Sequence, residues 1–340
     1  MSSRKFLYVS NADVKSLLSP ADAVRIARET LVEHAHNAVD WANPRQTDLF
    51  VRDSPTRYKM KGCVLNETGV AGFRVVGLHR TEEGYALAAH RPTKNVLLSD
   101  PDTGEFFAIV DERWGYGIRT GACGAVAVEA LRTSDSTDCS IIGTGHMAYA
   151  TALTINEVMP LESMRVYSRN TERREAFAAR LSAELGIPVT ASDSVEACVR
   201  DASVIVTATE ATGPIVEHSW LKPGVVVYAM GGGQECDTES YEKMRFIVDE
   251  RQQVEVCYEI RDWIKAGTYD PAMIEADLAE VVTGVAGQRT NDQEQFLVRS
   301  QGLVTQDVAQ AYWVYQQAVE KGVGISLDSA LVEKSGDPLF

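Results

Sequence analysis

A glycine-rich turn between a predicted strand and a predicted helix constrains the fold of this chain more than any other feature of its sequence. The predicted strand at residues 139–142 (Cys-Ser-Ile-Ile) leads into Gly143-Thr144-Gly145-His146-Met147-Ala148. The first glycine allows a tight turn, the second lets the backbone approach a pyrophosphate, and the alanine lets the helix pack closely on the strand. In this context the pattern G-x-G-x-x-A predicts a dinucleotide site at a helix N-terminus.

The turn lies in a regular alternation of predicted strands and helices. Strands are predicted at residues 139–142, 165–168, 188–190, 203–207, 225–229 and 246–248, and helices at residues 148–158, 171–185, 195–200 and 238–244. Several of these strands are continuous valine and isoleucine runs, which are typical of a parallel sheet that is covered on both faces. The predicted fold class is therefore α/β, with a doubly wound parallel Rossmann sheet.

The N-terminal part has a different pattern, because short β-rich segments replace the alternation. They are predicted at residues 57–64, 72–78, 95–100 and 106–110, with a hairpin turn at residues 100–104. A helix rich in small residues, 117–132, leads into the Rossmann part, and the helix 304–321 with the tail is predicted to return to the first domain. We expect an α+β domain of residues 1–124 with 311–340, and a Rossmann domain of residues 125–310.

Composition excludes several classes of partner. The formal net charge is −15, which argues against binding to nucleic acid or to an anionic membrane. The six cysteines are scattered without a C-x-x-C pair, so we expect neither a disulfide framework nor a metal site. The sequence has no signal peptide and no apolar stretch of membrane-spanning length, which predicts a cytoplasmic protein. An anionic substrate would need a local basic pocket, so internal arginines are of interest.

The end of the second Rossmann strand bears on the choice of nucleotide. NAD sites usually place an acidic residue there to bind the ribose 2′-hydroxyl. This chain has Ser168, Arg169 and Asn170 instead. A hydroxyl, a guanidinium and an amide suit a 2′-phosphate better than a diol. The pattern therefore favours NADP(H), while NAD(H) stays open and Arg169 has the alternative role of a solvated arginine at a helix start.

Three motifs together resemble the ornithine cyclodeaminase/mu-crystallin family: residues 117–122 (Gly-Ile-Arg-Thr-Gly-Ala), residues 141–145 and residues 300–304 (Ser-Gln-Gly-Leu-Val). The likeness extends from Phe6 to about Leu327. It implies that the first domain binds substrate and forms a homodimer through its sheet. Family members include cyclodeaminases, pyrroline-carboxylate and ketimine reductases, and alanine dehydrogenases.

The resemblance also implies roles for single residues. Arg45 and Arg119 match the arginines that bind the substrate carboxylate, a task for which the planar guanidinium is suited. The active-site lysine of the family falls at Arg74, which we interpret as a third clamp for a dicarboxylate. The catalytic aspartate of the cyclodeaminases falls at Gly233. Loss of a lysine and an aspartate argues against cyclodeamination, which needs a base.

Other residues complete the candidate site. Lys59 and Lys61 are possible substitute proton donors, with solvated strand lysines as the alternative interpretation, and His79 and His90 are possible general acids. Glu235 and Asp237 reach the site only if the glycine loop is displaced by two residues, and Asp307 is expected to start a helix. The predicted cofactor-binding residues are Thr120, Gly143, Thr144, Gly145, His146, Met147, Ser168, Arg169, Asn170, Thr207, Ala208, Thr209, Met230, Gly231 and Ser300.

These observations predict an NAD(P)H-dependent reductase of a small imino acid, of the ketimine, pyrroline-carboxylate or iminosuccinate type. Two alternatives stay open at this point. One is a cyclodeaminase with tightly bound NAD, and the other is a non-catalytic NADPH-binding protein similar to mu-crystallin.

Overall fold

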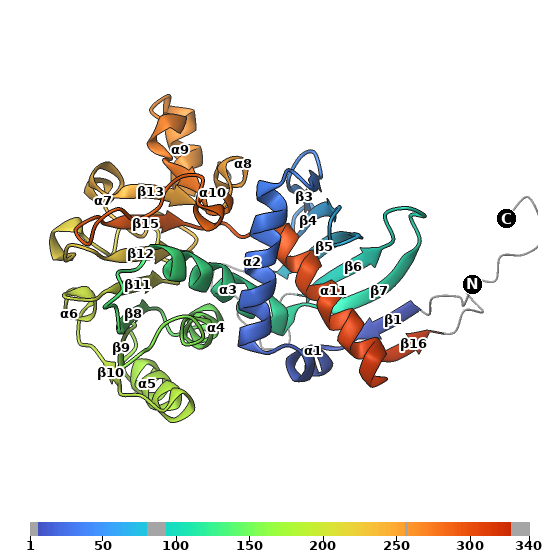
Figure 1. Cartoon of the computed structure of the whole chain (residues 1–340), viewed down its shortest axis with the longest axis horizontal. Helices are drawn as coiled ribbons and strands as arrows, with labels where there is room; N and C mark the ends of the chain where they lie inside the picture. The colour runs from blue at the N-terminus through green and yellow to red at the C-terminus, as the bar shows by residue number, and fades with distance from the viewer. Residues whose placement is uncertain (1–5, 80–92, 256–257, 328–340) are drawn as a thin grey trace, which may run out of the picture. The chain divides into compact units, whose positions relative to one another are not determined.

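The computed structural model describes residues 6–79, 93–255 and 258–327. The chain divides into two compact units (Figure 1). Unit 1 comprises Met1–Ser19, Asn37–Tyr116 and Val304–Phe340, and unit 2 comprises Pro20–His36 and Gly117–Leu303. Helix α2 (Pro20–Ala35) groups with unit 2 because it packs on helices α4 and α10, whereas the sequence placed it with the first domain. The helix rich in small residues begins in unit 1 and continues in unit 2.

Unit 1 is built on an eight-stranded sheet in the order β16-β1-β7-β6-β5-β4-β2, with β3 also paired to β4. All pairs are antiparallel except the parallel pair of β1 and β7. The strands are β1 (Phe6–Val9), β2 (Val39–Trp41), β3 (Thr47–Phe50), β4 (Thr56–Leu65), β5 (Val70–His79), β6 (Thr93–Ser99), β7 (Phe106–Asp111) and β16 (Ile325–Leu327). The predicted β-rich segments of this part are thus confirmed.

Helix α11 (Val304–Lys321) covers one face of this sheet, as the sequence predicted. Gly72 of β5 allows the close contact, because an added Cβ would lie 2.6 Å from a methyl carbon of Val308. The shorter helix α1 (Asn11–Leu17) also packs on α11 and begins with a capping box formed by Ser10 and Asp13. The apolar residues of this face, among them Leu65 and Val96, are fully buried.

Unit 2 contains a second eight-stranded sheet in which every strand pair is parallel. The order is β10-β9-β8-β11-β12-β15-β13-β14, so the chain reverses direction across the sheet between β8 and β11. The strands are β8 (Asp138–Ile142), β9 (Ser163–Tyr167), β10 (Val189–Ala191), β11 (Val204–Thr207), β12 (Val226–Ala229), β13 (Arg245–Val248), β14 (Ala276–Asp277) and β15 (Phe296–Arg299). The predicted doubly wound Rossmann sheet is confirmed, with β15 inserted between β12 and β13 and β14 added at the edge.

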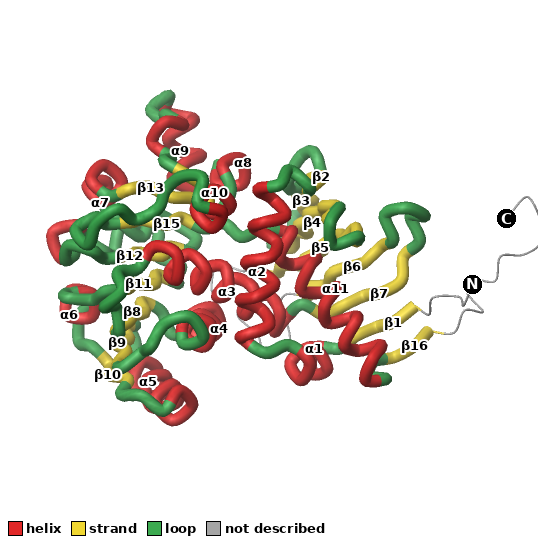
Figure 2. The backbone as a smooth tube through the Cα atoms, in the orientation of Figure 1, coloured by secondary structure: helices red, strands yellow, loops and turns green. Residues whose placement is uncertain are grey.

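Helices lie on both faces of this sheet, with α6 and α7 on the left and α3 and α4 on the right of the strands in Figure 2. The helices are α3 (Arg113–Leu131), α4 (His146–Ile155), α5 (Thr171–Leu185), α6 (Val195–Val199), α7 (Thr238–Lys243), α8 (Arg251–Val254), α9 (Tyr258–Ala266) and α10 (Leu278–Thr283). Small residues of α3 permit close packing, because a Cβ on Gly121 would lie 2.8 Å from Cα of Thr151 on α4.

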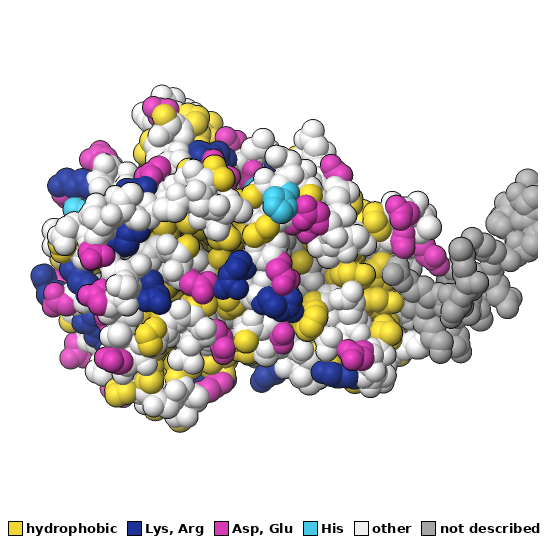
Figure 3. All heavy atoms as spheres, in the orientation of Figure 1, with side chains coloured by type: hydrophobic (Ala, Val, Ile, Leu, Met, Phe, Trp, Pro, Cys, Tyr) yellow, Lys and Arg dark blue, Asp and Glu magenta, His cyan; other side chains and the backbone are white. Residues whose placement is uncertain are grey.

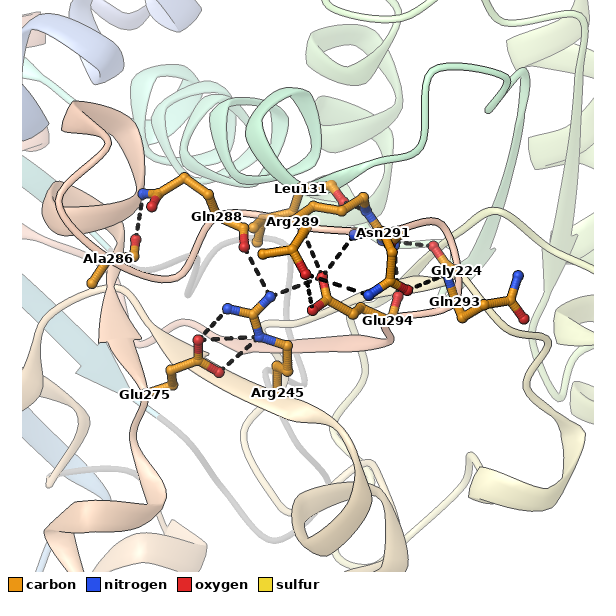
Figure 4. Close-up of polar contacts among 11 residues, drawn as sticks. Leu131, Gly224, Arg245, Glu275, Ala286, Gln288, Arg289, Asn291, Gln293 and Glu294 are labelled. Carbon is orange, nitrogen blue, oxygen red and sulfur yellow. Dashed lines mark hydrogen bonds and ion pairs between the residues drawn. The ribbon is translucent and has the colours of Figure 1, made fainter.

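An arginine cluster closes the amino edge of this sheet (Figure 4). Arg245 and Arg289 place their guanidinium carbons 4.7 and 5.0 Å from the centre of the Phe296 ring. Arg245 pairs with Glu294 at 2.9 Å, and Arg289 donates a 2.6 Å bond from Nε to the carbonyl of Leu131 at the end of α3. The cluster therefore anchors the end of α3 to the start of β15.

Acidic and basic side chains are interspersed on the face drawn in Figure 3. The described cysteines are buried and form no disulfide. In the part of the chain that the structure describes, no cluster of residues is suited to a metal ion. No helix there is both long and apolar enough to cross a membrane.

Candidate functional site

The turn after β8 has the geometry that the sequence predicted. Gly143 has φ +117°, and an added Cβ would lie 2.4 Å from the carbonyl oxygen of Ala208. Only glycine suits both the backbone angle and this close approach. The turn therefore lies directly beside the end of β11, at the point where the strand order reverses. Ligands of open α/β sheets bind at such a point.

The N-terminus of α4 has the space that a pyrophosphate needs. Gly145 is the N-cap and supplies no side-chain cap, and nothing lies within 4 Å of the position of an added Cβ. The backbone N–H groups of the first turn are thus available to an anion. His146 packs against Gly117 of α3, where a Cβ would lie 2.3 Å from its Nε2. Thr144 and Met147 are half-buried beside it.

Three residues at the end of β9 surround the N-terminus of α5. Ser168 donates from Oγ to the carbonyl of Asn170 at 3.2 Å. Asn170 is the N-cap, since its Oδ1 accepts a 2.8 Å bond from the backbone N–H of Arg173. The Arg169 side chain is exposed. Asn170 thus has a structural role as a cap, while Ser168 and Arg169 lie where a ribose substituent would bind in a Rossmann domain.

A buried carboxylate holds the loops that follow β11 and β12. Glu235 accepts from Oγ1 of Thr207 at 2.6 Å, from N and Oγ1 of Thr209 at 2.9 and 2.6 Å, and from N of Gly231 at 2.8 Å. Its residue is 1% exposed. Gly231 allows the contact, because a Cβ there would overlap the carboxylate. This structural role of Glu235 was not predicted, since no local motif in the sequence marks it.

The hydroxyls of the two predicted threonines are therefore directed toward Glu235. Thr207 is fully buried, and its neighbour Ala208 is half-buried beside Gly143. Met230, half-buried at the end of β12, accepts a 3.8 Å bond at its sulfur from Thr151 Oγ1. The loops that contain these residues are thus fixed by hydrogen bonds to Glu235.

A second buried carboxylate fixes the loop after β15. Asp249 accepts from Oγ of Ser300 at 3.0 Å and from the backbone N–H groups of Gln301 and Gly302 at 2.7 and 2.6 Å. Gly302 has φ +85° and lies against Arg119, since a Cβ there would be 2.5 Å from Nη1 of the guanidinium. The structure thus brings Ser300 and Arg119 to the same loop of unit 2. Thr120, next to Arg119, is buried.

A buried ion pair also stabilises the loop after β15. Arg299 pairs with Glu259 of α9, and both side chains are 1% exposed. Arg299 also donates from Nη1 to the carbonyls of Ala229 and Ser300 at 3.2 and 3.1 Å. Removing one partner from such a pair leaves an uncompensated buried charge. The sequence predicted no role for either residue.

In unit 1, Arg74 is bound by two carboxylates. Its Nε donates to Glu112 at 2.6 Å and lies 3.5 Å from Asp307 of α11, and all three side chains are buried. Burial alone lowers the pKa of the guanidinium, but the charges of Asp307 and Glu112 outweigh burial and raise it. Asp307 lies in the first helical turn, as expected, and has this additional partner. Glu112 was missed, because nothing in the sequence marks it as a partner of Arg74.

Lys59 and Lys61 lie on the same sheet face as Arg74, since Lys61 is directly opposite Arg74 in the β4–β5 register. Burial lowers the pKa of Lys59, the charges of Arg57 and Arg74 lower it further, and Asp48 opposes them. Arg45 places its guanidinium 4.0 Å from the centre of the Trp41 ring.

Two candidate groups have other partners. His79 forms a 2.7 Å hydrogen bond with Thr56 at the open end of the hairpin, and His90 lies outside the described residues. Asp237 is the N-cap of α7, where it accepts from Ser240. A Cβ at Gly233 would lie 2.5 Å from the carbonyl oxygen of Ala211, so this position has no room for an aspartate without a backbone shift.

Comparisons with known proteins identify the family of the chain. The profile of the ornithine cyclodeaminase/mu-crystallin family matches residues 5–322. The chain is 32% identical over 239 residues to a Delta(1)-pyrroline-2-carboxylate reductase of Bacillus cereus, which covers 68% of this chain and 73% of that protein. It is 30% identical over 324 residues to an alanine dehydrogenase of Archaeoglobus fulgidus, which covers 94% and 97%.

Solved structures of imino-acid reductases and an alanine dehydrogenase are similar to this chain along nearly its whole length. The Thermococcus litoralis Delta(1)-pyrroline-2-carboxylate reductase in complex with NADH and L-proline has a TM-score of 0.88 at 27% identity, over 95% of this chain and all of that one. An archaeal alanine dehydrogenase dimer with bound NAD has 0.87 at 26%, over 95% and 99%. The iminosuccinate reductase of Paracoccus denitrificans with NAD+ has 0.86 at 25%, over 96% and 100%.

The Rossmann sheet with its open glycine turn and the relatives of the chain together define a nicotinamide-dependent oxidoreductase that acts on imino or amino acids. The predicted enzyme class is confirmed by these relatives. The chain belongs to the ornithine cyclodeaminase/mu-crystallin family.

Proposed function

We propose that this protein reduces the C=N bond of a small imino acid to the amino acid and uses NADPH in preference to NADH. The observation that carries the reaction type is the open N-terminus of α4 beside the strand-order reversal, in a family of imino-acid reductases and amino-acid dehydrogenases. A reduced nicotinamide supplies the hydride in such a reaction. The chain's own residues bind and orient the reactants and supply a proton.

For the cofactor, the residues fit the group. Gly143, Gly145 and the first N–H groups of α4 would hold the pyrophosphate, because the glycines leave space and the helix dipole favours negative charge. The backbone of residues 207–209 and 230–231, together with Ser300, would border the nicotinamide. These assignments rest on the position of the loops at the carboxyl edge of the sheet.

The preference for NADPH rests on the end of β9. No acidic side chain lies at residues 168–170 to accept a bond from a ribose diol. The exposed Arg169, the Ser168 hydroxyl and the N-terminus of α5 are suited to a 2′-phosphate. NADH would be used with lower affinity.

For the substrate, the family resemblance assigns carboxylate binding to Arg45 and to Arg119, because a planar guanidinium suits a bidentate contact with a carboxylate. Lys59 is the proposed proton donor to the imine nitrogen. Its pKa is lowered and therefore lies closer to neutral pH, which suits a group that must give up a proton. Lys61 is the second candidate for this task.

The two alternatives have less support. A cyclodeaminase needs an aspartate at the position of Gly233, and the backbone leaves no space for it. A purely cofactor-storing protein would need neither the buried Arg74 nor Lys59.

We further propose a homodimer that forms through the sheet of unit 1. The face opposite α11 exposes large apolar side chains, including Tyr58 at 43%, Phe73 at 46% and Phe106 at 46%. Phe73 and Phe106 already contact each other with ring centres 6.0 Å apart. Such a patch marks an interface, and a second copy of this chain is the proposed occupant. A cytoplasmic location stays a prediction from the sequence.

The test is oxidation of NADPH, followed at 340 nm, with Δ1-pyrroline-2-carboxylate and with 2-oxo acids in the presence of ammonia. Turnover that requires the imine, and a lower KM for NADPH than for NADH, is the expected result. Release of ammonia from ornithine without net absorbance change would overturn the proposal in favour of a cyclodeaminase.

A further inference from the structure

The guanidinium of Arg119 is in contact with the backbone of the loop after β15. The position of an added Cβ on Gly302 lies 2.5 Å from Nη1 of Arg119 and 3.2 Å from both Cζ and Nη2. These three atoms are the nearest to that position, so the glycine faces the charged end of the side chain and not its stem. The orientation of the guanidinium therefore depends on where the backbone of Gly302 lies.

The backbone of α3 fixes the other end of the Arg119 side chain. Gly121 permits close packing of α3 on α4, and a Cβ on Gly124 would lie 2.6 Å from a ring carbon of Tyr228. Contacts as close as these leave the helix little freedom to move, because protein interiors are densely packed. The direction of the Arg119 guanidinium is thus set by its contact with Gly302 and not by movement of α3.

Asp249 determines where the backbone of Gly302 lies. Its Oδ2 accepts from the backbone N–H groups of Gln301 and Gly302 at 2.7 and 2.6 Å, and from Oγ of Ser300 at 3.0 Å. Its Oδ1 accepts from the backbone N–H of Glu250 at 2.9 Å, which fixes the carboxylate at the end of β13. The residue is fully buried, and hydrogen bonds to an ionised acceptor are stronger than those between neutral groups. The carboxylate therefore holds the loop in one position.

We propose that Asp249 is a positioning residue for the substrate, because it orients the Arg119 guanidinium through the backbone of Gly302. The inference rests on the proposed function, in which Arg119 binds the carboxylate of the imino acid. A bidentate contact between a guanidinium and a carboxylate is directional, so a small rotation of the guanidinium weakens it. Asp249 thus differs from Glu235, which fixes the loops that are predicted to border the nicotinamide.

The first variant that tests this role is Asp249→Asn. Asparagine has a single acceptor oxygen, so its NH2 group faces either the N–H of Glu250 or the donors of residues 300–302. We expect KM for the imine to rise on the order of 10-fold, as for weakening of a hydrogen bond to a charged group. Because the lost interaction binds the substrate before and during the reaction alike, kcat should fall less than about threefold. Kd for NADPH should also change less than about threefold.

A double-mutant cycle with Arg119→Met shows whether Asp249 acts through this arginine. If Asp249 orients the guanidinium, its substitution costs little once the guanidinium has been removed. Asp249→Asn should therefore lower kcat/KM on the order of 10-fold in the wild type and less than about twofold in Arg119→Met. A residue that only stabilised the fold would lower kcat/KM by the same factor in both backgrounds.

Gly302→Ala disturbs the same contact without a change in the carboxylate. Its methyl group would overlap the guanidinium of Arg119, so KM for the imine should again rise on the order of 10-fold. Asp277→Asn is the matched control, because Asp277 accepts from the backbone N–H of Glu280 at 3.0 Å as the cap of α10 in the same unit. Its KM for the imine and its Kd for NADPH should equal those of the wild type.

Rates are measured with Δ1-pyrroline-2-carboxylate and with pyruvate in the presence of ammonia, and Kd is measured from NADPH fluorescence. Equal losses in both backgrounds of the cycle, a rise in Kd for NADPH as large as the rise in KM, or a wild-type KM in folded Asp249→Asn would overturn the inference. If Asp249→Asn does not fold, Gly302→Ala decides, and a wild-type KM in that variant overturns the inference. A wild type that reduces no imine is a different result, because it overturns the proposed function itself.

Discussion

Thr209 donates two hydrogen bonds to the same oxygen of Glu235, one from its backbone N–H at 2.9 Å and one from its hydroxyl at 2.6 Å. The other carboxylate oxygen accepts from Thr207 and from the backbone of Gly231. One buried side chain thus joins the loops after two neighbouring strands of the Rossmann sheet. Glu235 binds the loops at residues 207–209 and 230–231, which are predicted to border the nicotinamide. It is therefore a positioning residue, because it would act on a ligand only through those loops.

Glu235→Gln should weaken NADPH binding. In the wild type, both carboxylate oxygens of Glu235 accept hydrogen bonds. The glutamine amide replaces one of these oxygens with an NH2 group, which cannot accept, so at least one buried N–H loses its acceptor, at a cost of about 1–3 kcal/mol. We expect Kd for NADPH to rise on the order of 10-fold or more, with a smaller change in kcat at saturating cofactor. Titration of NADPH fluorescence measures the affinity directly.

Asp237→Asn is the matched control, because Asp237 is a nearby carboxylate that accepts from the backbone N–H of Ser240 as the cap of α7 and from that of His218 at 3.1 Å, neither of which lies in the loops that Glu235 binds. It should reduce the free energy of unfolding by about 1 kcal/mol or less and leave Kd for NADPH unchanged. An unchanged Kd in folded Glu235→Gln would contradict the positioning role.

The main features of the fold were predictable from local patterns. Helices Thr171–Leu185 and Val304–Lys321 were predicted at their observed bounds, since both have a continuous amphipathic pattern. Strand β15 was missed because it follows a polar loop and contains Arg299, and its place between β12 and β13 is a matter of sheet topology. The residue pattern of one strand does not show which other strands lie next to it in the sheet.

The candidate site was predictable only where backbone geometry demands a residue type. Gly143 is such a case, since its φ and its contact with Ala208 allow only glycine. Glu235, Asp249 and Glu112 were missed as partners, because their hydrogen bonds join segments far apart in the sequence. Arg74 was predicted in the site, but its two carboxylate partners could be found only from the structure.

Arg169→Ala should raise KM for NADPH on the order of 10-fold and leave KM for NADH nearly unchanged. The reason is that a 2′-phosphate loses a charge-assisted hydrogen bond while a diol loses none. Initial rates with each nucleotide at a fixed imine concentration measure the effect. Arg180→Ala is the control, since Arg180 lies on α5, the helix that begins just after Arg169, and places its guanidinium 4.0 Å from the centre of the Tyr149 ring. Equal increases for both nucleotides in Arg169→Ala would argue against 2′-phosphate recognition.

Lys59→Met should lower kcat by roughly 100-fold or more, as expected for loss of a general acid. The pKa of Lys59 is lowered by burial and by Arg57 and Arg74. A donor must be protonated, so the wild-type kcat should decrease as the pH rises through this lowered pKa, at a pH below 10.5. The pH–rate profile of Lys59→Met should lack this decrease in kcat at high pH, and the profile of Lys61→Met should keep it. If kcat of Lys59→Met still decreased at high pH in the same way, Lys59 would be excluded as the group whose titration causes the decrease.

Glu294→Gln should destabilise the enzyme in a manner that depends on pH. Partial burial raises the pKa of Glu294, but hydrogen bonds from Thr290 and the charge of Arg245 lower it to about 2. Because the pKa is below its usual value of 4.5, the stabilisation is present above about pH 4.5 and is lost as the pH falls toward 2. The side chain is 19% exposed, so we expect a loss of about 1–2 kcal/mol near neutral pH.

Urea unfolding at pH 6 and pH 3 tests this expectation, because the difference between wild type and Glu294→Gln should narrow at the lower pH. Glu275→Gln is the matched control, since Glu275 pairs with the same Arg245 but is 37% exposed. Solvent screens that pair, so its loss should be smaller, about 0.5 kcal/mol. Because Glu294 also binds the backbone of Thr290 at 2.7 Å, a larger effect of Glu294 would show that fixing the loop before β15 matters more than the ion pair. Equal effects of the two variants at both pH values would instead assign the stabilisation to Arg245 alone.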